Sequence, residues 1–174
     1  MSTGTAKSTN IANGLIGELT HEAETTRKIL ERIPTELFDY KPHDKSMTMI
    51  RLATHVAEMI NWINVTCTTD ELDFAAGGNE PFAAKDTAEL LAYHDKNVTE
   101  ALEALKNTSD EDMHKDWSLK NGETTYFTMT KIACLRTFCL NHVWHHRGQL
   151  SVYLRLNDIP VPSIYGPSAD EGQM

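Results

Sequence analysis

Apolar residues recur at intervals of three and four positions in four separate stretches of this chain, and this spacing most constrains how it can fold. The stretches cover residues 11–33, 46–63, 86–105 and 128–157. Such spacing places an apolar stripe along one side of a helix, and the stripe must be buried against another element. We therefore predict an all-α fold, in which four long helices pack as a bundle within a single domain of residues 1–174.

Residues that begin or end helices support this division. Ser46 is a plausible N-cap of the second helix, and Asp86, followed by Glu89, resembles a capping box at the start of the third. Two prolines within residues 159–162 cannot continue the fourth helix. Residues 158–174 are therefore expected to form an extended C-terminal tail.

The remaining segments carry weaker signals. Residues 1–10 are rich in small polar side chains, contain no apolar block typical of a signal peptide, and are expected to form a mobile N-terminal tail. Residues 70–85 include two consecutive glycines and a proline, and their apolar residues show no regular spacing. This pattern indicates a loop. Asn121-Gly122, flanked by apolar residues between Trp117 and Phe127, could form a small hairpin.

Charge and cysteine usage exclude several classes of partner. The formal net charge of −9 opposes binding to the phosphate backbone of a nucleic acid. No apolar run approaches the roughly 18 residues of a membrane-spanning helix. Cys67, Cys134 and Cys139 match neither a disulfide framework nor a zinc-binding CxxC pattern. A cytoplasmic protein with reduced thiols and no nucleic-acid or membrane partner is expected.

Histidines at helical spacing indicate a metal site. His142 and His146 lie one turn apart on the same face of the fourth helix, in phase with its apolar stripe. Two buried imidazoles need partners, and shared coordination of zinc, nickel, copper or iron would supply one. His55, at core phase in the second helix, could be a third ligand and leave a fourth position open. From spacing alone, core histidines that only form hydrogen bonds are an equal alternative.

Three motifs lie along the chain, one that leads into the second helix, one in the fourth helix and one in the tail. They are Pro42-His43-Asp44-Lys45-Ser46 leading into Leu52-Ala53-Thr54-His55, then His142-x-x-x-His146-Arg147-Gly148-Gln149-Leu150, and Pro162-Ser163-Ile164-Tyr165-Gly166-Pro167. With these motifs the chain resembles the DinB superfamily, also called DinB/YfiT-like, over nearly its whole length. The resemblance implies a four-helix up-down-down-up bundle and one divalent transition metal, zinc or nickel, held by His55, His142 and His146. Met47 stands where an aromatic residue often occurs in this group.

Members of this superfamily include thiol-dependent transferases and isomerases that use mycothiol or bacillithiol. The resemblance therefore implies a metal-dependent transferase that activates a low-molecular-weight thiol for reaction with a small-molecule substrate. A metal-dependent hydrolase and a non-enzymatic metal-binding protein are the alternatives. No organic cofactor is expected, and no catalytic residue is assigned. A homodimer is also expected, because Gly148 offers a place for close helix approach.

Five further residues have open roles. Glu22 and Glu58 could orient a histidine or move protons, or they could be edge carboxylates that reach water. Cys139 could bind the metal or act as a nucleophile, although buried cysteine is more often a small apolar residue. Arg147 could contact an anion or the metal ligands, or be solvated. His145 is rotated by about 100° from His146 and is expected to face another surface.

Overall fold

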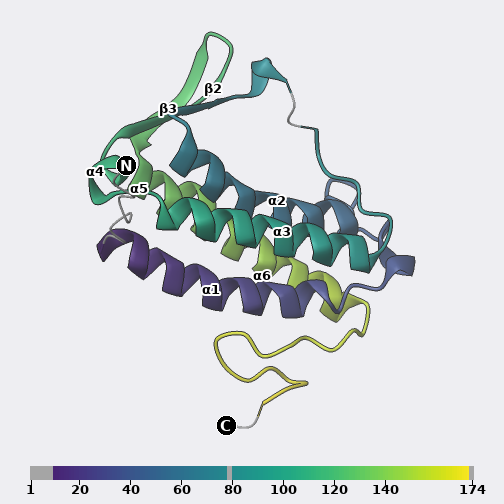
Figure 1. Ribbon diagram of the computed structural model, residues 1–174. Coiled ribbons are helices and arrows are strands. Elements are labelled where there is room, and N and C mark those ends of the chain that lie inside the picture. Colours follow the sequence, from purple (N-terminus) through teal and green to yellow (C-terminus); the bar gives the residue numbers. More distant parts are fainter. Residues whose placement is uncertain (1–9, 78–79, 173–174) are drawn as a thin grey trace.

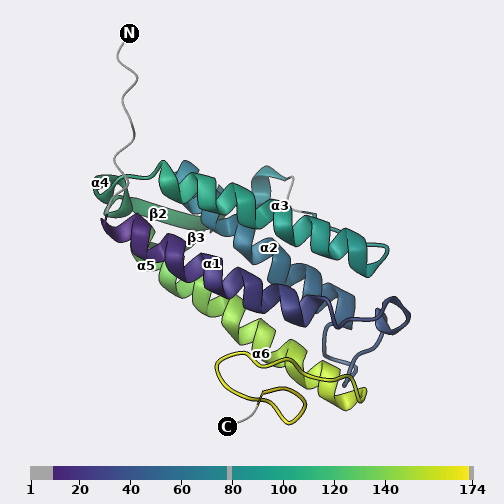
Figure 2. The same cartoon turned by 60° about the horizontal axis from the view of Figure 1, so that its bottom comes forward.

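A computed structural model describes residues 10–77 and 80–172 of the chain. Four long helical segments lie side by side along its length (Figures 1 and 2). The short elements are η1 (Thr35–Leu37), η2 (Phe74–Ala76) and α4 (Asp110–Met113). The long segments are α1 (Asn10–Leu30), α2 (Met49–Thr68), α3 (Thr87–Lys106), and a fourth in which α5 (Lys131–Cys134) continues through the π-helical turn η3 (Leu135–Leu140) into α6 (Asn141–Leu156).

The connection between α2 and α3 runs back along the molecule before α3 begins, so these two helices are parallel to each other and antiparallel to α1 and α6 (Figure 1). Asp86 caps α3 as predicted, because its carboxylate accepts a hydrogen bond of 2.8 Å from the backbone N–H of Glu89. The prediction for α2 was wrong, because Thr48 rather than Ser46 is the N-cap and accepts from the backbone N–H of Arg51.

A three-stranded sheet stands at one end of the helices, so the all-α prediction was wrong for this part of the chain. Strands β2 (Asp116–Asn121) and β3 (Thr124–Thr130) form an antiparallel hairpin, which confirms the hairpin suggested at Asn121-Gly122. Gly122 has a φ of +59°, a left-handed conformation that glycine adopts readily. Strand β1 (Glu71–Asp73) lies in the segment predicted to be a loop, and it pairs in parallel with β2. Its three residues are too few to show an alternating pattern.

Two of the apolar clusters follow each other along the helices, and a third, of Trp117, Leu119 and Cys134, lies at the sheet. Of the two along the helices, the cluster nearer the sheet includes Val56 and Val143, and the other includes Ala53 and Leu150. On α2 the two clusters meet around residues 53–57, because Ala53 and Ala57 belong to one cluster and Val56 to the other. On the last helix they meet between Val143 and Leu150. His55 and His146 lie where the two clusters meet.

Residues 158–172, within the segment expected to be a C-terminal tail, contain no helix or strand. The tail nevertheless packs back against the helices, because Arg32 pairs with Glu171 and Arg155 pairs with Asp170. The N-terminal tail predicted for residues 1–10 lies outside the described residues, except for Asn10, which begins α1. No helix within the described ranges is long and apolar enough to cross a membrane.

Candidate metal centre

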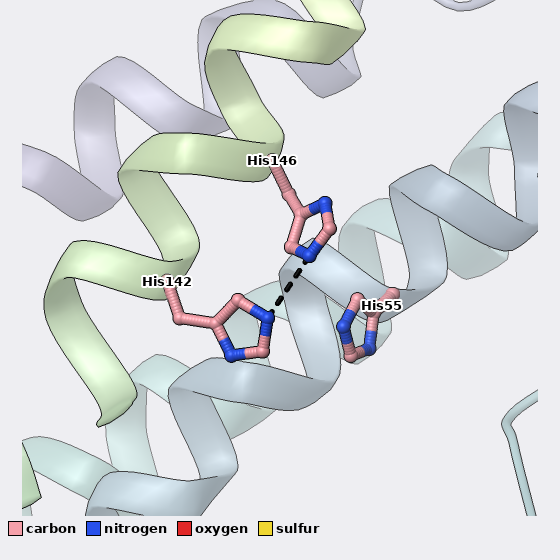
Figure 3. Close-up of side chains that lie close together, drawn as sticks. All are labelled: His55, His142 and His146. Atoms are coloured by element: carbon pink, nitrogen blue, oxygen red, sulfur yellow. Dashed lines mark hydrogen bonds between the residues drawn. The ribbon is translucent and has the colours of Figure 1, made fainter. Parts of the chain in front are cut away.

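Three histidines from two helices converge at the centre of the molecule. His55 comes from α2, whereas His142 and His146 come from successive turns of α6, and all three rings face one another (Figure 3). One nitrogen from each ring lies within 4.8 Å of the others. The Nε2 atoms of His142 and His146 are 2.9 Å apart. The structure therefore brings together the three residues that the sequence singled out.

The π-helical turn determines which side of α6 the histidines occupy. The sequence analysis treated residues 128–157 as one regular helix, with His142 and His146 inside its apolar stripe. In the structure, the buried positions of α6 include Val143, Arg147 and Leu150, and both histidines are half-buried beside that stripe. They consequently remain accessible from the surface, as ligands of an exchangeable metal or a substrate-binding metal must be.

Two of the rings form a hydrogen bond outside the cluster, and the third has a carboxylate nearby. Nδ1 of His146 lies 2.8 Å from Oε1 of Gln149, and His142 forms a hydrogen bond with the backbone of Phe138. Nδ1 of His55 is 3.5 Å from Oε2 of Glu58. Partners of this kind fix the ring orientation of metal-binding histidines and raise their basicity.

The electrostatics keep two of the imidazoles in the form that binds metal. Burial, reinforced by the neighbouring rings of His146 and His55, lowers the pKa of His142 to about 4. Burial also lowers the pKa of His146. Both rings are therefore neutral near pH 7, and a neutral imidazole offers a lone pair to a cation.

The residues present fit a divalent transition metal. Nδ1 of His55 is buried and forms no hydrogen bond of normal geometry among the described residues, although Oε2 of Glu58 is 3.5 Å away. Three imidazoles are a common ligand set for zinc and also suit nickel, copper and iron. Within the described part of the chain, no carboxylate or thiolate completes a fourth position of this cluster.

Two hollows reach the histidines from different sides. The first has a volume of about 350 Å³ and contains His55 in its wall, together with Arg51, Glu58, Asn61, Trp62, Phe74, Glu80, Pro81 and Tyr93. The second, of about 400 Å³, contains His146 in its wall, together with Lys45, Ser46, Met47, Gln149, Val152 and Tyr153. Both volumes fall in the range of small-molecule sites.

A pair of aromatic rings covers the side of the metal centre that faces the sheet. The rings of Trp62 and Phe138 are stacked, with centroids 4.7 Å apart. The Trp62 ring lies 5.9 Å from both His55 and His142. This pair shields one side of the cluster from water.

Glu58 is the acidic residue that the structure places next to the histidines. Its Oε2 also accepts a hydrogen bond of 3.0 Å from Arg51, and its Oε1 accepts one of 2.9 Å from the backbone N–H of Phe82. Burial opposes ionisation of Glu58, but its bonds with His55, Arg51 and Phe82 lower its pKa overall. Glu58 is therefore an engaged carboxylate, rather than an edge residue that reaches water.

Glu22 and Arg147 have a different role from either alternative raised by the sequence. Arg147 is only 2% exposed, and its Nη1 donates a hydrogen bond of 2.6 Å to Glu22 and one of 3.1 Å to Thr26. The hydroxyl of Tyr165 in the C-terminal tail donates to Glu22 at 2.8 Å. These residues join α1, α6 and the tail, and they point away from the metal centre.

Cys139 and His145 also lie outside the cluster. The thiol of Cys139 is fully buried beside Cys134 and lies 3.8 Å from the hydroxyl of Thr66. His145 is exposed, and its Nε2 contacts the side-chain amide of Gln149 at 3.0 Å. Its ring nevertheless packs edge-on against that of His146, with centroids 4.9 Å apart.

Sequence reasoning did not single out Arg51 and Trp62, which line the first hollow with His55 and Glu58. All four lie on one side of α2, at intervals of four, three and four residues. A polar and aromatic stripe within an otherwise apolar helix was the available signal. Tyr93 and Glu80 come from other elements, so spacing along α2 could not have identified them.

Comparison with known proteins gives consistent matches along almost the entire chain. The model of the DinB family matches residues 5–173. The uncharacterized protein YrdA of Bacillus subtilis (strain 168) is 30% identical over 152 residues, which cover 86% of this chain and 85% of YrdA.

Two solved structures share the fold. A DinB-like protein of Bacillus cereus ATCC 10987 superimposes with a TM-score of 0.70 at 24% identity, covering 88% of this chain and 97% of that protein. The DinB-like protein YjoA of Bacillus subtilis gives a TM-score of 0.69 at 17% identity, covering 87% of this chain and 96% of YjoA.

Proposed function

The chain belongs to the DinB family, and from this premise we propose that it is a metal-dependent transferase that activates a low-molecular-weight thiol, built on a four-helix up-down-down-up bundle. The observation that carries the proposal is the convergence of His55, His142 and His146 between two hollows. A transferase must bring two substrates to one centre, and the hollows provide a separate approach for each.

The three histidines would hold one divalent ion, zinc or nickel. Such an ion supplies a Lewis acid that favours the deprotonated form of a thiol at neutral pH. The protein's own groups would do the rest. Glu58 and Gln149 hold two of the rings in place from outside, and the stacked Trp62 and Phe138 exclude water from the side toward the sheet.

The state of Glu58 favours the transferase over the hydrolase. Hydrolysis at this centre would need a base that takes a proton from water, and Glu58 is the acidic residue next to the histidines. Its two oxygens already accept hydrogen bonds from Arg51 and the backbone of Phe82. A carboxylate engaged in this way supports the histidine rather than accepting a further proton.

We also propose that the protein is a cytoplasmic homodimer. Val152 and Leu156 of α6 are 55% and 56% exposed, and on the same face no other part of the described chain comes within 4 Å of the position where a Cβ of Gly148 would stand. Exposed apolar residues beside a glycine allow a second helix to approach closely. Light scattering that gives the monomer mass across micromolar concentrations would reject the dimer.

Metal analysis of natively purified protein, followed by cobalt substitution, tests the proposed function. We expect one metal per chain, and we expect cobalt-loaded protein to develop a sulfur-to-metal charge-transfer band when a thiol is added. The variant His142→Ala should lose high-affinity binding, whereas His21→Ala, which changes an exposed histidine on α1, should retain it. Full metal occupancy in His142→Ala would refute the site. Metal-dependent ester or amide hydrolysis without any thiol band would favour the hydrolase.

A further inference from the structure

The two hollows beside the histidines have no residue in common. His55 belongs to the wall of the first and His146 to the wall of the second. A molecule bound in either hollow therefore approaches the histidines from its own side. If the proposed transferase function holds, one hollow must take the thiol, and the charges of the walls distinguish them.

The first hollow offers little to an anion. Arg51 is its cationic residue, and the guanidinium donates to Glu58 at 3.0 Å, so its charge is largely compensated. Glu80 adds a second carboxylate to the same wall. The aromatic rings of Trp62, Phe74 and Tyr93 form much of the remainder. This wall suits an uncharged or aromatic substrate better than an acidic one.

The second hollow has the opposite character. Lys45 is the charged residue of its wall at neutral pH, and no carboxylate lines it among the residues that the structure describes. The protein as a whole carries a net charge of −9 and repels anions, so a wall with an uncompensated ammonium is a local exception.

A fixed turn places the polar groups of this wall. The backbone N–H of Lys45 donates to Nδ1 of His43 at 3.1 Å, and the backbone N–H of Ser46 donates to the carbonyl of His43 at 2.9 Å. Gln149 is already engaged with His146 and His145. The Lys45 ammonium and the Ser46 hydroxyl are therefore the groups best placed to contact a bound molecule.

Apolar side chains complete the wall between these groups and the metal centre. Met47, Val152 and Tyr153 lie in it, and the Tyr153 hydroxyl turns away to donate to the carbonyl of Met47 at 3.1 Å. A short carbon chain would be covered by this surface. Val152 also belongs to the face proposed for the dimer, whereas Lys45 and Ser46 precede α2 and lie outside that face.

We propose that the hollow beside His146 is the thiol subsite, and that Lys45, assisted by Ser46, binds a carboxylate at the far end of the thiol-bearing molecule. The sulfur then points toward the histidines, and the hollow beside His55 is left for the electrophile. The inference rests on the proposed function, and it specifies the class of thiol, namely one that carries a carboxylate.

Two small thiols of similar length test this directly. Cobalt-loaded protein is titrated with 3-mercaptopropionate and with 2-mercaptoethanol, and the charge-transfer band reports binding of each. We expect the carboxylate-bearing thiol to bind about fivefold more tightly, the size of one partly exposed ion pair. Lys45→Ala should remove this preference and leave the affinity for 2-mercaptoethanol unchanged. Lys41→Ala is the matched control, because Lys41 lies near Asp44 and outside the wall.

The outcomes distinguish a wrong subsite assignment from a wrong thiol transferase function. If both thiols give the band but wild type shows no preference, or if Lys45→Ala keeps it, the subsite assignment is wrong. If Arg51→Ala removes the preference instead, the carboxylate binds in the hollow beside His55. If neither thiol gives a band although cobalt is bound, the thiol transferase function itself fails, and the subsite with it.

Discussion

Replacing Arg147 by methionine should destabilise the protein more than any other single change to a charged residue of α6. The guanidinium is 2% exposed and bonds to Glu22 at 2.6 Å, to Thr26 at 3.1 Å and to the hydroxyl of Tyr165. Methionine fills much of the same volume but leaves the Glu22 carboxylate buried without its cation. Breaking a buried pair in this way costs about 3–5 kcal/mol.

Urea unfolding of the metal-free protein, followed by circular dichroism, measures this loss. With a slope of about 2 kcal/mol per molar urea, the midpoint should fall by roughly 1.5–2.5 M. Arg155→Met is the matched control, because Arg155 also lies on α6 and pairs with a carboxylate, Asp170, but is 47% exposed. Its midpoint should barely move, since exposed pairs contribute little.

A double-mutant cycle identifies the cause. Adding Glu22→Gln to Arg147→Met removes the unpaired charge, so the double variant should recover part of the lost stability, with a coupling of about 2 kcal/mol. The reasoning is refuted if Arg147→Met unfolds at the same urea concentration as Arg155→Met. It is refuted equally if the effects of the two substitutions simply add.

The remaining predictions concern the metal centre and the thiols. If all three histidines had an ordinary pKa near 6.5, lowering the pH from 7.5 to 5.5 would protonate them and weaken metal binding about thousandfold. His142, with its pKa lowered to about 4, stays neutral over this range. Zinc affinity from chelator competition should therefore fall by less than about hundredfold, and a thousandfold loss would contradict the lowered pKa. Glu58→Gln should weaken metal binding about 10- to 100-fold; an affinity as high as that of Glu80→Gln would show that Glu58 does not support His55. The contact with the Cys134 thiol, together with burial, raises the pKa of the Cys139 thiol. Iodoacetamide at pH 8 should therefore modify Cys139 only after unfolding, and mass spectrometry that finds it labelled in the folded protein would disagree.

The helical periodicity predicted the long helices well, because each one buries a continuous apolar stripe. The sheet was beyond the reach of the same argument. Strand β1 has three residues and pairs with β2, whose sequence lies more than forty residues further along the chain. Only the hairpin carried a local signal, at Asn121-Gly122, because its turn requires a positive φ that few residues adopt.

Spacing placed His142 and His146 on one side of a helix, because residues four apart share a side. His55 was assigned as their partner mainly from the resemblance to the DinB superfamily. The partners of these rings were harder to predict. Glu58 and Gln149 each lie three residues after the histidine that they support, a spacing that many exposed pairs also show. Whether the two side chains touch depends on their rotamers, which are determined by packing in the folded protein.

Arg147 shows a different limit of sequence reasoning. Its neighbours in the motif are the candidate metal ligands and their partners, which suggested a related role. The direction of its side chain is instead set by Glu22, at a separation of 125 residues. No periodicity connects positions so far apart, so only the fold could reveal that Arg147 joins α1 to α6.

The π-helical turn at Leu135–Leu140 has a consequence for how this centre tolerates insertions and deletions. A π turn accommodates one residue more than an α-helix of the same length, and the helix on either side keeps its place. Deleting one residue inside this turn should therefore straighten the helix while His142 and His146 still face His55. The same deletion between His142 and His146 would rotate one ring by about 100° away from the other. A sequence alignment of relatives should accordingly permit a one-residue gap at residues 135–140 and none between the two histidines.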